Sequence, residues 1–294
     1  PLVLVRPVDG VGRVDELLVE VATVRHRAHR NRLRPRRPAD SFSGMELGIS
    51  GRTALVVGAS RGIGRAIAAA LAREGARVAM ASRSREQLEQ AAAEVEGETA
   101  VFVADTSDLD RLAALPGEVE ETLGPIEILV ANTGGPPLGG ALDHGLDEWE
   151  RAYGSLVLAP RVLIEAVLPG MGERGWGRIV NVGSTSVREP IPGLALSNSH
   201  RMAAVGFFKT LAGEVAAQGI TVNTVATGRF ATDRLAANWG SWEEMERRAH
   251  EGVPAGRLGR PEEYGDLVAF LCSERAAYLT GAVIPLEGGL LRSV

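Results

Sequence analysis

The sequence predicts an α/β fold in which helices cover both faces of a parallel sheet. Two observations predict it. Short apolar segments of strand type alternate with longer helical segments between residues 52 and 286. The strand segments are apolar along their whole length rather than at every second position, which is typical of strands that are buried on both faces.

Each strand in this alternation is a short run of aliphatic and β-branched residues. The first, TALVV, is followed by the turn GASRGIG and the helical stretch RAIAAALAREG. Two more strand–helix pairs follow, with RVAMA and AVFVA as the strands. Strands are expected at residues 53–57, 77–81, 100–104, 126–131, 178–182, 220–226 and 282–286. Because crossovers between parallel strands are right-handed, we expect one doubly wound domain of about seven strands, a Rossmann fold.

The composition is that of a globular protein with a core of small aliphatic residues. The 294 residues are 45% hydrophobic and 4% aromatic. No apolar run approaches the ~20 residues of a membrane-spanning helix, and the opening PLVLV is too short for a secretory signal. The one cysteine, Cys272, excludes an internal disulfide and fits a reducing compartment. We therefore expect a cytoplasmic protein with no membrane partner, and a core position for Cys272 in the run LVAFLC.

The first 44 residues differ from the rest in charge. They contain nine arginines and five acidic residues, whereas residues 45–294 carry a net charge of −9. We expect residues 1–44 to be a basic, disordered leader or an upstream extension before Met45, and residues 45–294 to be the domain. The alternative is a basic arm for nucleic acid. The acidic body argues against binding to a phosphate backbone, so no nucleic-acid partner is expected.

The turn after the first strand has the pattern of a dinucleotide site. Gly58 permits a tight turn, Gly62 lets the backbone approach a pyrophosphate, and Gly64 lets the helix pack closely on the strand. The helix N-terminus then presents free N–H groups and a partial positive charge to the anion. The alternative is a glycine-rich turn without a ligand. The residues expected to contact the cofactor here are Gly58, Ser60, Arg61, Gly62, Ile63 and Gly64.

The end of the second strand favours NADP(H) over NAD(H). An acidic residue there would bind the ribose 2′-hydroxyl of NAD, whereas an arginine accepts a 2′-phosphate. Ser82 and Arg83 stand at this position, and Arg61 projects from the glycine turn. Because guanidinium groups match phosphate well, two arginines near one ribose indicate NADP(H). The alternative is that both arginines are only surface residues.

These motifs resemble the short-chain dehydrogenase/reductase family over about residues 52–289. VVGASRGIG is similar to the family's cofactor loop, and VADTSD, with Asp105, resembles its adenine-contacting turn. VANTGG, with Asn132 and Gly134, resembles its NNAG segment, while Thr227-Gly228 replaces the Pro-Gly of its nicotinamide loop. The stretches AVLPGM, GRIVNVGS, GITVNTVATG, GRLGRPEEY and YLTGAVIPLEGG also resemble family segments in family order. The pattern is most similar to bacterial 3-oxoacyl-thioester reductases and to sugar or alcohol dehydrogenases.

The resemblance implies an NADP(H)-dependent oxidoreductase that acts on a small carbonyl compound or alcohol as a homotetramer or homodimer. No metal is expected. The family's active site combines an Asn, a Ser and a helix that contains Tyr-x-x-x-Lys. Ser184 stands at the serine position, but Ser197 and Arg201 occupy the tyrosine and lysine positions, and Ser155 occupies the asparagine position.

These exchanges leave three interpretations of the stretch LALSNSHRMA. A serine hydroxyl is a far weaker acid than a tyrosine phenol, and arginine keeps its charge at neutral pH. In the first interpretation Ser184 and Ser197 hold the carbonyl oxygen, Arg201 stabilises its charge, and water carries the proton. In the second, His200 or Tyr153 is the acid. In the third, the protein binds nucleotide without redox turnover, as a sensor or a structural subunit.

A long charged segment after the sixth strand, about residues 228–258, is expected to form a lid over the substrate. Ligands of open α/β sheets lie beyond the carboxyl ends of the strands, where this segment begins. Trp242 and Met245 fit an amphipathic helix within it. The alternative is a helical insertion that packs on the surface.

Overall fold

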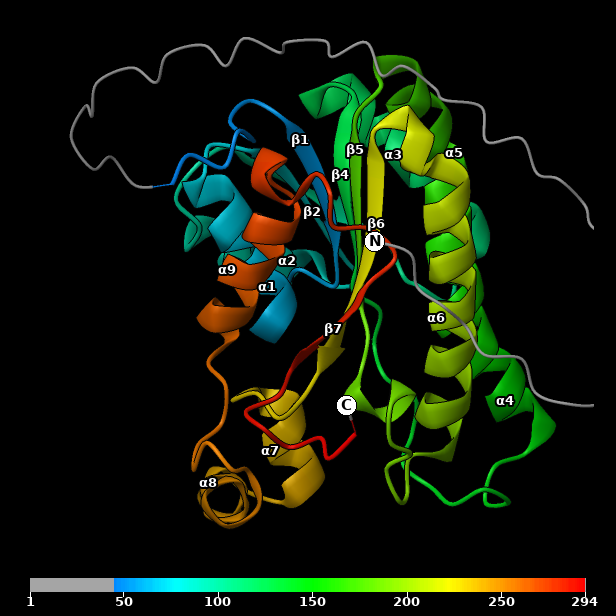
Figure 1. Ribbon diagram of the computed structural model, residues 1–294, viewed down its shortest axis with the longest axis vertical. Coiled ribbons are helices and arrows are strands. Elements are labelled where there is room, and N and C mark those ends of the chain that lie inside the picture. The colour runs from blue at the N-terminus through cyan, green and yellow to red at the C-terminus, as the bar shows by residue number, and fades with distance from the viewer. Residues whose placement is uncertain (1–44, 294) are drawn as a thin grey trace, which may run out of the picture. The chain divides into compact units, whose positions relative to one another are not determined.

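The computed structural model describes residues 45–293, and these form a parallel sheet with helices on both faces (Figure 1). The strand order is β3-β2-β1-β4-β5-β6-β7. The chain therefore winds outward in one direction from β1 and in the other from β4, which confirms the doubly wound fold. The basic leader expected at residues 1–44 lies outside the described residues.

The seven expected strands occur in the expected order and nearly at the expected positions. They are β1 (Thr53–Val57), β2 (Arg77–Ser82), β3 (Thr99–Val103), β4 (Ile126–Ala131), β5 (Gly177–Val182), β6 (Ile220–Thr227) and β7 (Val283–Leu286). Every residue of β1 and of β5 is buried. These strands lie in the middle of the sheet, where helices cover both faces, and this explains why their sequences are apolar throughout.

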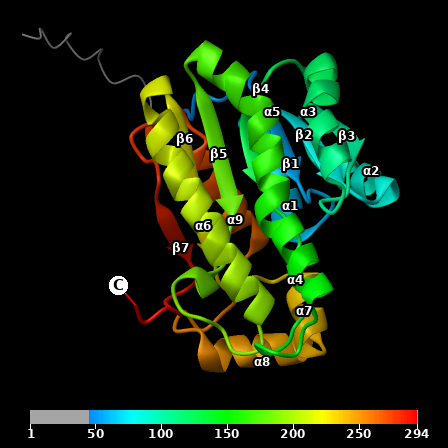
Figure 2. The ribbon, with the colours of Figure 1, turned by 90° about the vertical axis from the view of Figure 1, so that its right-hand side faces the viewer.

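Helices α1, α2 and α9 pack on one face of the sheet, and α3, α5 and α6 pack on the other (Figures 1 and 2). The helices are α1 (Gly62–Arg73), α2 (Arg85–Ala93), α3 (Leu109–Leu123), α4 (Leu146–Tyr153), α5 (Ala159–Arg174), α6 (Ala195–Val215), α7 (Asp233–Trp239), α8 (Trp242–Gly252) and α9 (Pro261–Leu271). A π-helical segment, η1 (Gly154–Leu158), joins α4 to α5, and a 3-10 turn, η2 (Thr185–Val187), follows β5. The two apolar layers that result are the core of the domain.

One helical stretch differs from the expectation that no apolar run approaches the length of a membrane span. Leu146–Arg174, which comprises α4, η1 and α5, is long and apolar enough to cross a membrane by length and composition. The mean hydropathy stays high because small and aliphatic residues surround the few charges, such as the ion pair between Arg161 and Glu165 (3.0 Å). The α5 part of this stretch buries an apolar face that includes Leu163, Ile164, Val167 and Met171. In this fold its apolar character therefore serves the core.

Cys272 lies fully buried directly after α9, as its apolar neighbours predict. Burial raises the pKa of its thiol to about 12, although the positive charge of Arg178 acts in the opposite direction. A thiol with this pKa remains protonated at neutral pH, so Cys272 is a core residue and not a nucleophile.

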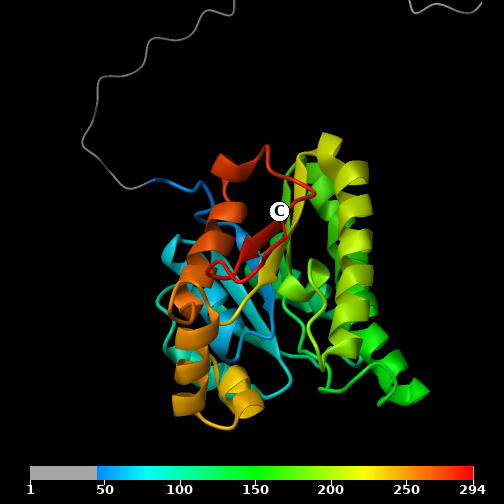
Figure 3. The same cartoon turned by 60° about the horizontal axis from the view of Figure 1, so that its bottom comes forward.

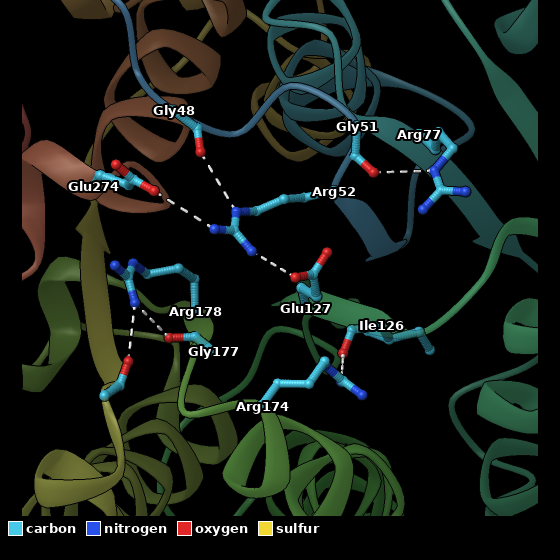
Figure 4. A network of polar contacts seen from close by, with 11 residues as sticks. Gly48, Gly51, Arg52, Arg77, Ile126, Glu127, Arg174, Gly177, Arg178 and Glu274 are labelled. Atoms are coloured by element: carbon cyan, nitrogen blue, oxygen red, sulfur yellow. Dashed lines mark hydrogen bonds and ion pairs between the residues drawn. The ribbon is translucent and has the colours of Figure 1, made fainter.

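At the amino-terminal edge of the sheet, two arginines stack on one indole. The guanidinium carbons of Arg52 and Arg178 lie 3.5 Å and 4.2 Å from the centroid of the Trp176 ring. Arg52 also pairs with Glu127 (2.5 Å) and Glu274 (3.5 Å) (Figure 4). This network joins the loop before β1 to β4, β5 and the segment after α9.

Arg178 is the buried member of this network, with 2% of the residue exposed. Its guanidinium donates to three backbone oxygens, those of Gly177 (2.9 Å), Gly219 (3.1 Å) and Ser273 (3.2 Å). Burial lowers the pKa of Arg178, because a charge is unfavourable away from water, and the three carbonyl oxygens offset part of this cost. The side chain therefore links three backbone segments at the amino-terminal ends of the strands, on the opposite side of the sheet's ends from the glycine turn.

We expect Arg178→Ala to lower the free energy of unfolding by roughly 3–5 kcal/mol, because it leaves buried carbonyl groups without a donor. Urea denaturation followed by circular dichroism measures this loss. Arg161→Ala is the matched control, since it removes an exposed ion pair and should change stability by less than about 1 kcal/mol. Equal effects of the two substitutions would contradict the structural role of Arg178.

Candidate functional site

The turn from β1 into α1 brings the backbones of a strand and a helix into direct contact. A Cβ atom at Gly64 would lie 2.0 Å from the carbonyl oxygen of Gly58, so no side chain fits there. Gly58 and Gly62 have φ angles of +67° and +53°, which residues with a side chain rarely adopt. The amide of Asn132, directly after β4, donates to the Gly58 oxygen (3.3 Å) and holds the turn closed.

The start of α1 fits the diphosphate of a dinucleotide. Arg61 is its N-cap residue, and no side chain caps the first turn. The free backbone N–H groups therefore point out of the helix end together with its partial positive charge. Because Gly62 and Gly64 have no side chains, an anion can approach these groups closely. Ile63 packs its side chain against the core, so its backbone alone is available for such a contact.

The end of β2 and the turn after β3 meet beside the glycine turn. The Ser82 hydroxyl donates to the Ser60 hydroxyl (3.1 Å), which ties β2 to the glycine turn. The Asp105 carboxylate accepts hydrogen bonds from the backbone N–H (3.0 Å) and the hydroxyl (2.9 Å) of Ser107. These hydrogen bonds, the backbone one first, and the charge of Arg83 lower the pKa of Asp105. Arg83 is exposed and close enough to Asp105 to share a site with it.

α6 presents Ser197 and Arg201 one turn apart and joins them directly. The Nε of Arg201 donates to the Ser197 hydroxyl oxygen (3.2 Å), and its Nη1 donates to the carbonyl oxygen of Val182 (2.8 Å). Val182 is the last residue of β5, and Ser184 follows it by two positions. The guanidinium thus ties the helix that carries Ser197 to the strand end that carries Ser184.

The hydroxyl oxygens of Ser184 and Ser197 each accept one hydrogen bond within the protein. Ser184 accepts a hydrogen bond from the backbone N–H of Ser186 (3.1 Å), and Ser197 accepts one from Arg201. Within residues 45–293 neither hydroxyl has an acceptor for its own proton. Both protons are therefore available to an oxygen atom of a ligand. Ser197 is 7% exposed, so such an oxygen would reach it only from the cleft side.

The charge of Arg201 is not paired. Burial, together with the positive charge of Arg234, lowers the pKa of Arg201 to about 10, while the Tyr264 phenol acts in the opposite direction. In the part of the chain that the structure describes, no carboxylate lies within ion-pair distance of Arg201. The guanidinium remains charged at neutral pH and can stabilise negative charge on a neighbouring oxygen.

The other candidate acids have contacts of their own outside the pair of Ser197 and Arg201. The Nδ1 of His200 donates to the backbone oxygen one turn earlier in α6 (2.7 Å), and its ring lies 5.1 Å from the Trp149 ring between centroids. Tyr153 packs on the other part of the same imidazole (6.1 Å) and is 44% exposed. His200 therefore serves the contact between α4 and α6. The Ser155 hydroxyl, in η1, donates to a backbone oxygen of α4 (3.4 Å).

The nicotinamide-loop candidates lie at the end of β6. The hydroxyls of Thr227 and Tyr264 share a hydrogen bond (2.9 Å). A Cβ at Gly228 would lie 2.5 Å from the Cα of Glu287, so this glycine allows β6 to approach β7. Gly134, in the loop after β4, has open space beside its Cα.

Within residues 45–293 no cluster of three or more histidine, cysteine or acidic side chains is arranged to hold a metal ion.

The segment expected to be a lid folds as a unit of its own. It contains α7 and α8, and Figure 3 shows both next to α9. At its base, Ala231 and Gly259 pair through their backbones (2.9 Å), as do Gly259 and Arg229 (2.9 Å). It has a separate small core, made of Ala236, Met245, Ala249, Val253 and Leu258. Met245 is fully buried in it, whereas Trp242, expected on the same helix, is 44% exposed.

Two residues near the site are absent from the prediction based on sequence. Tyr264 is fully buried in α9, and burial raises the pKa of its phenol. Its spacing from Val268 and Leu271, which are also buried, is the signal that could have marked it as a core position. Arg234, in α7, lies close to Arg201 and Arg61. Nothing in the local sequence separates it from the other arginines of the lid.

Comparison with known proteins places these features among oxidoreductases. Residues 58–291 match the family model described as Enoyl-(Acyl carrier protein) reductase. The chain is 36% identical over 248 residues to human dehydrogenase/reductase SDR family member 4, which covers 82% of this chain and 88% of that protein. It is 35% identical over 245 residues to the 3-oxoacyl-[acyl-carrier-protein] reductase of Haemophilus influenzae, which covers 83% of this chain and 100% of that protein.

A solved structure also resembles the fold over its whole length. L-sorbose reductase from Gluconobacter frateurii, in complex with NADPH and L-sorbose, superposes with a TM-score of 0.81. The two chains are 30% identical, and the match covers 85% of this chain and 100% of that one. The likeness thus extends from the glycine turn to β7, across every element that borders the candidate site.

Proposed function

This chain belongs to the short-chain dehydrogenase/reductase family, and on that premise we propose that it is an NADP(H)-dependent reductase of small carbonyl compounds with a modified proton relay. The observation that carries the proposal is the hydrogen bond from Arg201 to Ser197 at the end of β5, where Ser184 also lies. The hydroxyls of Ser184 and Ser197 and the unpaired charge of Arg201 therefore lie at the carboxyl ends of the strands, as the glycine turn does.

The geometry at the carboxyl ends of the strands supports a cofactor site there. The backbone at Gly58, Ser60, Gly62, Ile63 and Gly64 would bind the diphosphate. Arg61 and Arg83 would bind the 2′-phosphate, and this pair supports NADP(H) over NAD(H). NADPH-bound relatives such as the sorbose reductase support the same choice. Asp105 would border the adenine end, and the residues proposed for the nicotinamide end are Asn132, Gly134, Thr227 and Gly228.

When bound, the reduced cofactor supplies a hydride to the carbonyl carbon. The chain must then bind the carbonyl oxygen and stabilise its growing negative charge. Ser184 and Ser197 donate hydrogen bonds to that oxygen, and a hydroxyl that accepts from a guanidinium is a stronger donor. Arg201 supplies positive charge without giving up a proton, so water delivers the proton to the product. Loss of a positioned general acid costs ~10²–10⁴ in rate, so we expect a slow reductase.

A second candidate is a protein that binds the nucleotide without turnover. The burial of Ser197, together with the weak acidity of a serine hydroxyl, favours it. Calorimetric titration with NADPH and measurement of NADPH oxidation against a panel of ketones, aldehydes and oxo acids distinguish the two. Binding with oxidation supports the reductase, binding without oxidation supports the second candidate, and no binding by the folded protein contradicts both.

For the cofactor, we expect Arg83→Ala to weaken NADPH binding at least about tenfold and to leave NADH binding nearly unchanged, since Arg83 would contact only the 2′-phosphate. Quenching of protein fluorescence gives both dissociation constants. Arg161→Ala, at an exposed arginine of α5 that pairs with Glu165, is the control and should affect neither cofactor. Equal losses for NADPH and NADH in Arg83→Ala would count against the assignment.

For the relay, we expect kcat/KM for reduction to stay level near neutral pH and to fall as the pH rises through about 10, where Arg201 loses its charge. Arg201→Lys should move this fall to lower pH, because lysine has the lower intrinsic pKa. A pH–rate profile of both proteins measures the shift. If Arg201→Met retains the alkaline fall of the native protein, another group causes it.

A further inference from the structure

We propose that the carbonyl substrate of this site carries a carboxylate and that Arg234, from α7 of the lid, binds this carboxylate. This inference rests on the proposed reductase function and specifies its substrate class. It arises from a cationic side chain that has no hydrogen-bond or ion-pair partner within residues 45–293.

The position of Arg234 is defined by its contacts with two loops. Its Nη2 and Cζ lie 2.2 Å and 2.7 Å from where a Cβ of Gly135 would stand, so the guanidinium rests on the loop after β4. Two residues earlier, the Thr232 methyl group lies 3.3 Å from where a Cβ of Gly62 would stand. The start of α7 thus lies against both the glycine turn and the loop after β4, with Thr232 at the first and Arg234 at the second.

The other arginines of the lid all have partners. Arg247 and Arg248 pair with Glu244 (2.8 Å and 2.5 Å), and Arg257 pairs with Glu263 (2.7 Å). The guanidinium of Arg229 lies 5.0 Å above the Trp239 ring. Arg234 is different: within residues 45–293 its side chain has no hydrogen bond, ion pair or aromatic contact. Its neighbours are cations instead, since it lies near both Arg61 and Arg201.

Three arginines that share a cleft repel one another unless an anion lies between them. Burial, and then the charge of Arg61, lowers the pKa of Arg234, because a buried charge beside a like charge is unfavourable. An anionic ligand reverses this effect, because a guanidinium binds a carboxylate through two parallel hydrogen bonds. The cleft therefore favours a ligand with negative charge beyond the glycine turn.

The location of this charge points to the substrate rather than to the cofactor. In the proposed cofactor site, the N–H groups at the start of α1 would bind the diphosphate, and Arg61 and Arg83 would bind the 2′-phosphate. The charge of Arg234 acts on Arg201, which in turn hydrogen-bonds to Ser197, so Arg234 lies on the side of the site where the carbonyl oxygen would bind. A substrate carboxylate bound there would be separated from the substrate's carbonyl carbon by no more than one or two bonds of its carbon skeleton. The substrates that fit are 2-oxo and 3-oxo acids.

The test compares matched pairs of oxo acids and their methyl esters, such as acetoacetate and methyl acetoacetate, over 2-oxo and 3-oxo acids of four to eight carbons. We expect the native protein to prefer the acid in at least one pair. Arg234→Gln should lower kcat/KM for that acid at least about tenfold, the effect of losing a hydrogen bond to a charged group, and leave the ester within about twofold. Arg247→Gln, which removes an exposed charge from the same lid, is the matched control and should change neither value.

A binding measurement separates this inference from the proposed function. Titration of the acid into the protein–NADP⁺ complex should give heat that is lost in Arg234→Gln and kept in Arg247→Gln. If no acid or ester is reduced at all, the reductase proposal fails. If, in addition, Arg234→Gln does not reduce the heat of acid binding, this inference fails as well. If the native protein prefers no acid, or if Arg234→Gln weakens NADPH as strongly as the acid, Arg234 does not select the substrate.

Discussion

A contact between two backbones, which only glycine permits, determines where this molecule can bind a ligand. The carbonyl oxygen of Gly58 lies only 2.0 Å from where a Cβ of Gly64 would be, so α1 starts directly against the end of β1. Asn132 closes the same turn from the end of β4. Because β1 and β4 are the strands from which the chain winds in opposite directions, the cleft opens at this point. The free N–H groups of α1, the end of β2, and the side chains of Ser184 and Ser197 all lie at the carboxyl ends of the strands as a consequence.

Arginines at the two ends of the strands differ in whether the protein supplies partners for their charge. At the amino-terminal edge, Arg52 is paired with carboxylates, and Arg178 is surrounded by backbone oxygens. At the carboxyl-terminal edge, Arg201 and Arg234 lie close together without a carboxylate in the described part of the chain. The first arrangement is complete within the protein and contributes to stability. The second lacks such partners, and the proposed carboxylate site rests on this observation.

The exchange of a tyrosine–lysine pair for Ser197 and Arg201, as proposed from the family pattern, changes how charge and proton are supplied. A lysine and a tyrosine can share a titration near neutral pH, whereas a guanidinium with a pKa of about 10 stays charged. The hydrogen bond from Arg201 therefore positions the Ser197 hydroxyl and polarises it but does not deprotonate it. A site of this kind is suited to holding an oxyanion while solvent provides the proton, and its output depends on how well the substrate is held.

Much of this could be predicted from the sequence because the signals are local. Continuous apolar strands show burial on both faces, and the glycines at 58, 62 and 64 show a turn that no other residue can form. The apolar run around Cys272 likewise predicts its burial. The membrane-length hydropathy of Leu146–Arg174 was missed because it arises from three consecutive helical segments rather than from one apolar run.

The sequence by itself determined the parallel sheet, the position of the glycine turn and the residue types on α6, since each depends on neighbours within a few positions. Only the tertiary structure decided which charges lack a partner. His200 and Arg201 are adjacent in the chain, yet one packs against Trp149 and the other joins the cleft. Arg234 is one of several arginines in a charged segment until the fold pairs the others with glutamates or an indole and leaves it beside Arg201. Pairing depends on distances between elements far apart in sequence, and local patterns hold no information about them.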